Sequence, residues 1–112
     1  MAHILIVEDD INLGQILFQE LKKHSHVVEL VENAEAALAR VNKYIYDLMI
    51  TDLKLPGMDG IELLKKIKGS NPSTSVIVMT GYASVDTAVV AMKNGAQDFV
   101  QKPFGLHELV QK

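Results

Sequence analysis

Five short runs of aliphatic and β-branched residues recur along the chain and predict β-strands. They span Ile4–Val7, Val27–Val31, Leu48–Ile50, Val76–Met79 and, more weakly, Phe99–Val100. The first, third and fourth runs are almost continuously apolar, whereas a strand with one solvated face alternates apolar and polar residues. This pattern indicates strands that are covered on both faces, as in a parallel sheet between two layers of helices.

The segments between these runs carry apolar residues at helical spacing. We expect helices around Leu13–Leu21, Ala34–Val41, Ile61–Ile67 and Val85–Met92, and a fifth helix after Pro103. Strands that alternate with helices over 112 residues predict one doubly wound α/β domain, residues 1–112, with right-handed crossovers and helices on both faces of an open sheet.

The fourth predicted helix has recognisable ends. Ser84 is a good N-cap residue, and Asn94-Gly95 is typical of a left-handed C-terminal stop. The apolar face that we expect this helix to present consists of Val85, Ala88, Val89 and Met92.

Composition narrows the classes of protein to which this chain can belong. Hydrophobic residues make up 48% of it and charged residues 22%, as in ordinary globular proteins. The 11 basic residues are outnumbered by 14 acidic ones, so we expect no direct binding of nucleic acid, which needs clustered cations. Cysteine is absent, which excludes disulfides and thiolate metal sites and favours a cytoplasmic location. No apolar run approaches membrane-spanning length, so we expect no membrane contact.

Polar side chains follow the predicted strands at their carboxyl ends, where ligands bind in open parallel sheets. We expect these side chains to share one edge of the sheet. They are Glu8, Asp9 and Asp10 after the first strand, Thr51 and Asp52 after the third, Thr80 after the fourth, and Gln101 and Lys102 after the fifth.

Each of these residues alone has an ordinary structural interpretation; Asp10, for example, is a good N-cap for the first helix. Together, however, neighbouring carboxylates repel one another, and a bound cation would offset this repulsion. A set of oxygen ligands without His or Cys favours Mg²⁺ that keeps several waters. Magnesium beside a lysine suits phosphoryl transfer, in which an aspartate carboxylate can itself be the nucleophile.

Four motifs then match a known family in order. The chain resembles the receiver domain of two-component response regulators from Ala2 to its last residue, through ILIVEDD, TDLKLPGMDG, VMTGYAS and DFVQKPF. Asp9 and Asp52 are 43 residues apart, Thr80 follows after 28 more and Lys102 after another 22. The resemblance implies a flavodoxin-like fold with strand order 2-1-3-4-5.

The resemblance also implies roles for the acidic residues. Asp52 would be the phosphoacceptor and a Mg²⁺ ligand, and Asp9 would bind the metal directly. Glu8 stands where many relatives have a second aspartate and would act on the metal largely through water. The backbone carbonyl of Lys54 would be a further ligand, while Asp10 keeps its capping role.

Other positions correspond to the residues that sense the phosphoryl group. Lys102 would pair with its oxygens, helped by a cis bond to Pro103, and Thr80 would donate a hydrogen bond to it. Gly81 would leave space for the phosphodonor, and Phe99 occupies the position of the switch aromatic.

Two positions, Lys54 and Tyr82, correspond to those that tune dephosphorylation in the family. They are a cation and a bulky aromatic beside the route of an attacking water. We therefore expect slow hydrolysis of the phosphorylated chain.

The implied function is a two-state switch. A sensor histidine kinase or phosphotransfer protein would phosphorylate Asp52, and the surface of the fourth helix, fifth strand and fifth helix would change to control an output domain or effector protein. TGYAS is similar to receivers that precede enhancer-binding transcription activators, so transcription is the expected output, with homodimer formation on phosphorylation as a further possibility.

Two functions of other classes are alternatives. A flavodoxin-like cofactor binder would share the architecture, but Glu8, Asp9 and Asp10 would repel a cofactor phosphate. A phosphatase with an aspartate nucleophile would carry a second acid two residues after it, where this chain has Lys54. Separately, the predicted fifth helix has only residues 104–112 available, so we expect a truncated helix and a receiver trimmed from a longer regulator.

Overall fold

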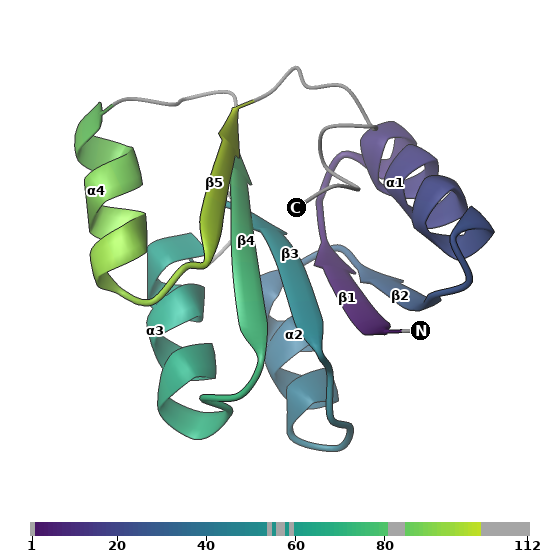
Figure 1. Cartoon of the computed structure of the whole chain (residues 1–112), viewed down its shortest axis with the longest axis horizontal. Coiled ribbons are helices and arrows are strands. Elements are labelled where there is room, and N and C mark those ends of the chain that lie inside the picture. The colour runs from purple at the N-terminus through teal and green to yellow at the C-terminus, as the bar shows by residue number, and fades with distance from the viewer. Residues whose placement is uncertain (1, 54, 56–57, 59, 81–84, 102–112) are drawn as a thin grey trace.

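The computed structural model describes residues 2–53, 55, 58, 60–80 and 85–101 (Figure 1). A five-stranded parallel sheet runs through the centre, in the order β2-β1-β3-β4-β5. The strands are β1 (His3–Val7), β2 (Val27–Val31), β3 (Leu48–Asp52), β4 (Ser75–Thr80) and β5 (Asp98–Gln101). The expected strand order is therefore confirmed.

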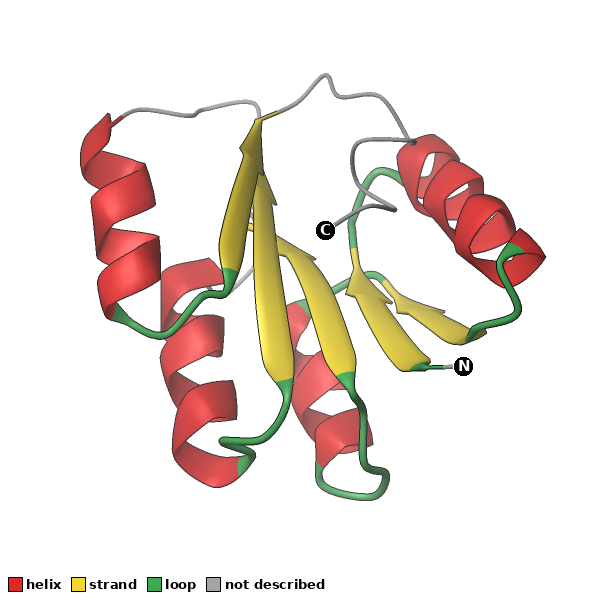
Figure 2. Ribbon diagram, viewed as in Figure 1, coloured by secondary structure: helices red, strands yellow, loops and turns green. Residues whose placement is uncertain are grey.

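Four helices connect the strands and cover both faces of the sheet (Figure 2). They are α1 (Ile11–Lys23), α2 (Ala34–Val41), α3 (Gly60–Ser70) and α4 (Val85–Lys93). The doubly wound α/β fold is confirmed, and the expected fifth helix falls on residues 104–112, outside the described residues. Within the described part of the chain, no helix is long and apolar enough to cross a membrane.

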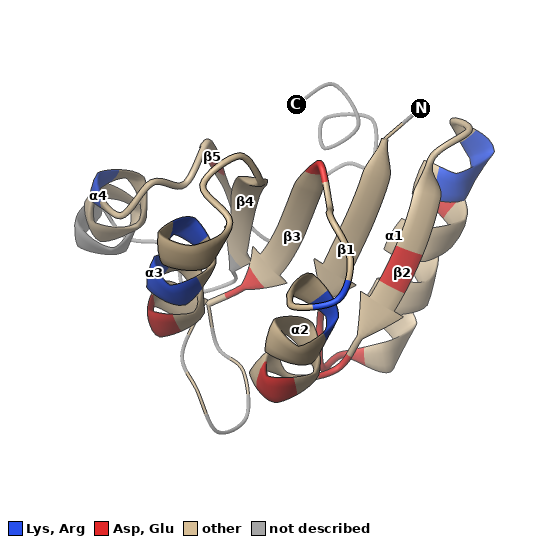
Figure 3. Cartoon of the chain, turned by 90° about the horizontal axis from the view of Figure 1, so that it is seen from below, with Lys and Arg blue, Asp and Glu red and all other residues tan. Residues whose placement is uncertain are grey.

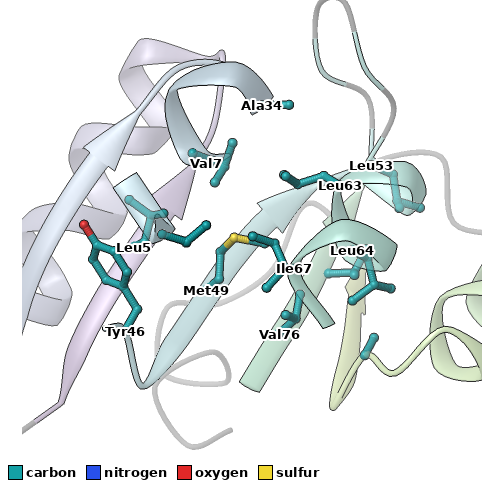
Figure 4. Close-up of a cluster of buried hydrophobic side chains, with 14 of the residues drawn as sticks. Leu5, Val7, Ala34, Tyr46, Met49, Leu53, Leu63, Leu64, Ile67 and Val76 are labelled. Atoms are coloured by element: carbon teal, nitrogen blue, oxygen red, sulfur yellow. The ribbon is translucent and has the colours of Figure 1, made fainter. Parts of the chain in front are cut away.

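The sheet divides the core into two clusters because successive side chains of a strand point to opposite faces. Ile4 and Ile6 of β1 pack with α1, whereas Leu5 and Val7 pack on the other face with α2 and α3. Figure 4 shows the larger cluster, in which Met49 of β3 lies between strand and helix side chains. This two-sided burial explains the unbroken apolar runs Ile4–Val7 in β1 and Leu48–Ile50 in β3.

Three strands extend further than the apolar runs predicted. β3 continues through Thr51 and Asp52, β4 through Thr80, and β5 through Gln101. Thr51 aligns with Val7 of β1, and Thr80 aligns with Gln101. The backbone ladder continues where side chains become polar. These polar residues therefore lie on the last positions of β3, β4 and β5, whereas Glu8, Asp9 and Asp10 follow β1 as predicted.

The predicted helix ends are correct where the structure describes them. The Asp10 carboxylate accepts a hydrogen bond from the backbone N–H of Leu13 (3.2 Å), as an N-cap of α1. Gly95 has φ +100°, the left-handed conformation of the expected stop after α4. The predicted N-cap Ser84 lies outside the described residues.

The predicted apolar face of α4 was wrong for Val89 and Met92. Both are exposed, at 43% and 46%, whereas Ala91 is fully buried in the larger core cluster and Ala88 is partly buried. Small side chains at positions 88 and 91 let this helix approach the core closely, so its larger aliphatic residues face outward. The structure does not describe the side chain of Val85.

Candidate functional site

Three carboxylates meet at the carboxyl edge of the sheet. One oxygen each from Glu8, Asp9 and Asp52 lie within 4.8 Å of one another. Glu8 and Asp9 directly follow β1, Asp52 ends β3, and the two strands are paired up to Val7 and Thr51. The predicted meeting of these acids is therefore confirmed. Figure 3 shows an acidic position in red at the carboxyl end of β3.

The three acids differ in burial and in hydrogen bonding. Glu8 is 1% exposed; its carboxylate accepts a hydrogen bond from the backbone N–H of Asp10 (3.0 Å), and its own N–H donates to the carbonyl of Val31 (3.0 Å). Asp52 is 7% exposed, whereas Asp9 is open to solvent. The site thus has two buried carboxylates at the carboxyl edge of the sheet and one accessible carboxylate at its rim.

This donor set suits a hard divalent cation. It offers carboxylate oxygens only, and Mg²⁺ prefers oxygen ligands while keeping several waters. Burial of Glu8 and Asp52 strengthens their attraction to a cation, because the effective dielectric constant falls away from solvent.

The other predicted site residues are only partly described. Thr80 ends β4 at the same edge of the sheet as Asp52, although its side chain is not described. Phe99 of β5 aligns with Val78 and packs, partly buried, against the larger core cluster. The remaining predicted residues lie outside the described residues: Lys54, Gly81, Tyr82 and Lys102.

One residue near the site was missed by sequence reasoning. Gly60 begins α3, and its N–H donates a hydrogen bond to the carbonyl of Leu53, the residue after Asp52 (2.7 Å). The sequence signal was available, since Gly at the first residue of a helix is a poor helix former that marks a close backbone approach.

Comparison with known proteins decides the family. Residues 4–112 match the response regulator receiver domain. The chain belongs to this family. Receivers are signalling domains rather than classical enzymes.

Curated relatives include transcriptional regulators. The chain is 45% identical to the transcriptional regulatory protein ZraR of Klebsiella oxytoca over 106 residues, which are 95% of this chain and 24% of ZraR. It is 41% identical to the response regulator protein FleR of Pseudomonas aeruginosa, over 97% of this chain and 23% of FleR. The chain therefore spans about a quarter of the length of these relatives.

Solved receivers share the fold closely. A CheY-like receiver domain protein from Methanospirillum hungatei superimposes with a TM-score of 0.95 at 33% identity, covering 99% of this chain and 89% of that one. A response regulator from Burkholderia pseudomallei with a phosphorylated aspartic acid and a calcium ion has a TM-score of 0.92 at 26% identity, over 98% of this chain and 65% of that one.

Proposed function

We propose that this receiver is a phosphorylation-activated signalling switch in which Asp52 accepts a phosphoryl group from a histidine kinase or phosphotransfer protein. The observation that carries the proposal is the meeting of Glu8, Asp9 and Asp52 at the carboxyl edge of the sheet. Asp52 is the buried member of this cluster that ends β3, the strand between β1 and β4. A calcium ion and a phosphorylated aspartic acid occur together in the response regulator protein from Burkholderia pseudomallei.

The chemistry follows from the charges at the site. A carboxylate oxygen of Asp52 attacks the phosphorus, and the bond from phosphorus to the donor's leaving atom breaks as the acyl phosphate forms. Bound Mg²⁺, held by Asp9, Asp52 and the Lys54 carbonyl and through water by Glu8, would neutralise the phosphoryl oxygens. Glu8 is suited to an indirect role, because its carboxylate already accepts a hydrogen bond from the Asp10 amide.

The signal would leave the site through Thr80, Lys102 and Phe99. Thr80 and Lys102 would bind the phosphoryl oxygens, and Gly81 would admit the donor. As Thr80 moves toward Asp52, Phe99 would enter the vacated space, and the surface of α4, β5 and the C-terminal segment would change. The partly buried state of Phe99 suits such a change, because the ring already packs against the core and needs only to turn further inward.

The output is proposed to be control of transcription in the cytoplasm. The similar ZraR is a transcriptional regulatory protein about four times as long as the matched region, so a further output domain would receive the signal. The receiver domain of NtrC4 forms a dimer when activated by beryllofluoride, at 29% identity and a TM-score of 0.93. Homodimer formation on phosphorylation is therefore part of the proposal, and direct binding of DNA by this domain is not.

The decisive test is a mass measurement. Incubated with a small phosphodonor and Mg²⁺, the wild-type chain should gain about 80 Da, the mass of one phosphoryl group. Asp52→Asn should gain nothing, whereas Asp47→Asn, just before the start of β3, should gain the same mass as the wild type. No gain in the wild type, or an equal gain in Asp52→Asn, would contradict the proposal.

Two measurements address the alternatives from the sequence. Turnover of a generic phosphate ester that survives in Asp52→Asn would favour a small-molecule phosphatase. Visible absorbance of the purified protein would favour a flavodoxin-like cofactor binder.

A further inference from the structure

Gly60 rests directly on the backbone of the proposed phosphoacceptor. A Cβ atom placed on Gly60 would lie 2.4 Å from the carbonyl oxygen of Asp52 and 2.6 Å from the Cα of Leu53, closer than real Cβ atoms approach other atoms. The N–H of Gly60 donates to the Leu53 carbonyl at 2.7 Å. The first residue of α3 therefore makes a backbone-to-backbone contact that leaves no room for a side chain.

Both elements in this contact are firmly held. α3 is anchored in the larger core cluster by Leu63, Leu64 and Ile67, each 0% exposed. β3 is paired with β1 up to Thr51 on one side and with β4 up to Asp52 on the other. Neither element can withdraw without breaking core packing or sheet hydrogen bonds, so a side chain at position 60 would displace the peptide that joins Asp52 to Leu53.

The contact at Gly60 differs from those at the other described glycines. A Cβ on Gly69, in the same helix, would meet nothing within 4 Å. A Cβ on Gly14 would approach only the end of the flexible Leu30 side chain, at 3.0 Å. Among these glycines, only Gly60 places its missing side chain against the backbone of a proposed site residue.

We propose that Gly60 is a positioning residue for phosphoryl acceptance. By bringing the start of α3 onto the Asp52 backbone, it fixes where the Asp52 carboxylate lies relative to Glu8 and Asp9. The proposal rests on the proposed function of Asp52. A misplacement of about 1 Å can lower the rate of a positioned reaction by about a hundredfold.

The test compares three variants for Mg²⁺ affinity and for the rate of the 80 Da gain described above. Gly60→Ala should accept the phosphoryl group about 10- to 100-fold more slowly than the wild type and bind Mg²⁺ alone more weakly. Gly69→Ala is the matched helix control and should keep the wild-type rate and affinity. Ile67→Val is the stability control, because shortening this buried side chain loosens the same helix without touching Asp52.

A folded Gly60→Ala variant that reacts at the wild-type rate would overturn the proposal. So would a Gly60→Ala variant that reacts no more slowly than Ile67→Val when the two have the same free energy of unfolding. Failure of the wild type to gain mass would instead contradict the proposed function, so the two failures are distinguishable.

A second measurement covers the case in which Gly60→Ala does not fold. In the wild type, saturating Mg²⁺ should slow hydrogen exchange of the Gly60 amide, bonded to Leu53, by a larger factor than exchange of the Gly95 amide, bonded to Met92. Equal slowing of both amides would count against the coupling of Gly60 to the site.

Discussion

The phenol of Tyr46 donates a hydrogen bond to the carboxylate of Glu29, which lies on β2, 17 residues earlier in the chain. His3 and Arg40 approach the same carboxylate, at 3.4 and 3.5 Å. The His3 and Tyr46 rings are in contact, with centroids 4.4 Å apart. This polar cluster joins the edge strand β2 to α2 and to the segment before β3. Burial, together with the Glu29 carboxylate, raises the pKa of the Tyr46 phenol above its usual value of 10.0.

Tyr46→Phe should lower the free energy of unfolding by about 1 kcal/mol at pH 8, because it removes a hydrogen bond to a charged acceptor that remains partly solvated. Since the pKa of Tyr46 is raised in the folded state, its contribution is complete below pH 10 and is lost as the pH rises above 10. The wild-type advantage should therefore shrink at high pH. Urea unfolding at pH 8 and pH 11 measures it, with the half-exposed Tyr44→Phe as control. An advantage that does not change with pH would contradict this prediction.

The acidic cluster predicts a dependence of stability on Mg²⁺. Asp9→Asn removes one charge at the solvent-exposed rim, so it should stabilise the metal-free protein by up to about 1 kcal/mol at low salt. Mg²⁺ at a hundred times its dissociation constant should stabilise the wild type by about 2.7 kcal/mol. The same Mg²⁺ concentration should stabilise Asp9→Asn much less. Thermal unfolding in EDTA and in Mg²⁺ measures both effects, and equal stabilisation of the two proteins would exclude Asp9 as a ligand.

Substitution by alanine should change the free energy of unfolding in opposite directions at Gly69 and Gly95. Gly69 lies in α3 with open space around it, so Gly69→Ala should stabilise the protein by about 0.5 kcal/mol through helix propensity. Gly95 has φ +100°, and a Cβ there would lie 3.1 Å from the Lys68 side chain, so Gly95→Ala should destabilise it by about 1 kcal/mol or more. Urea denaturation curves of both variants check the signs. Two changes of the same sign would be inconsistent with the packing described here.

The outward-facing residues of α4 predict a contrast within one helix turn. Val90 is 43% exposed, so Val90→Ala should change stability by less than about 0.5 kcal/mol. Ala91 is fully buried, so Ala91→Val should cost about 1–3 kcal/mol through overpacking. Chemical denaturation of the two variants measures both changes in the free energy of unfolding. A larger loss in Val90→Ala would mean that α4 is rotated from the orientation seen here.

Hydrolysis of the phosphorylated protein tests the two proposed tuning residues. Lys54→Ala and Tyr82→Ala should each lose the phosphoryl group several-fold faster than the wild type, because each opens the route of the attacking water. The decay of the 80 Da adduct after removal of the donor measures the rate. Decay in the wild type as fast as in both variants would rule out slow hydrolysis.

The parts of the fold that sequence predicts well are those in which burial controls residue type. Continuous apolar runs such as Ile4–Val7 predict doubly covered strands because helices pack on both faces. The strand ends were harder to predict, because Thr51 and Asp52 continue a backbone ladder that their polarity does not report. In α4, helical periodicity predicted that the bulkiest residues face the core. The buried residue is instead Ala91, because the helix lies close to the core.

The site was predictable for a topological reason. Acids at the ends of β1 and β3 must approach one another once these two strands are neighbours. Contacts between side chains far apart in the chain gave no periodic signal. The hydrogen bond between Tyr46 and Glu29 depends on how the segment before β3 lies against β2, which local spacing does not encode.

The two ends of the paired strands β1 and β3 should differ in stability. From the partners Ile4 and Leu48 onward, apolar side chains support both faces, whereas just beyond Val7 and Thr51 the carboxylates gather. Like charges oppose pairing only at that end, so without a cation at low salt the backbone amides near Asp52 should exchange faster than those near Leu48. We therefore expect the β1–β3 pair to open first at the end that carries the carboxylates.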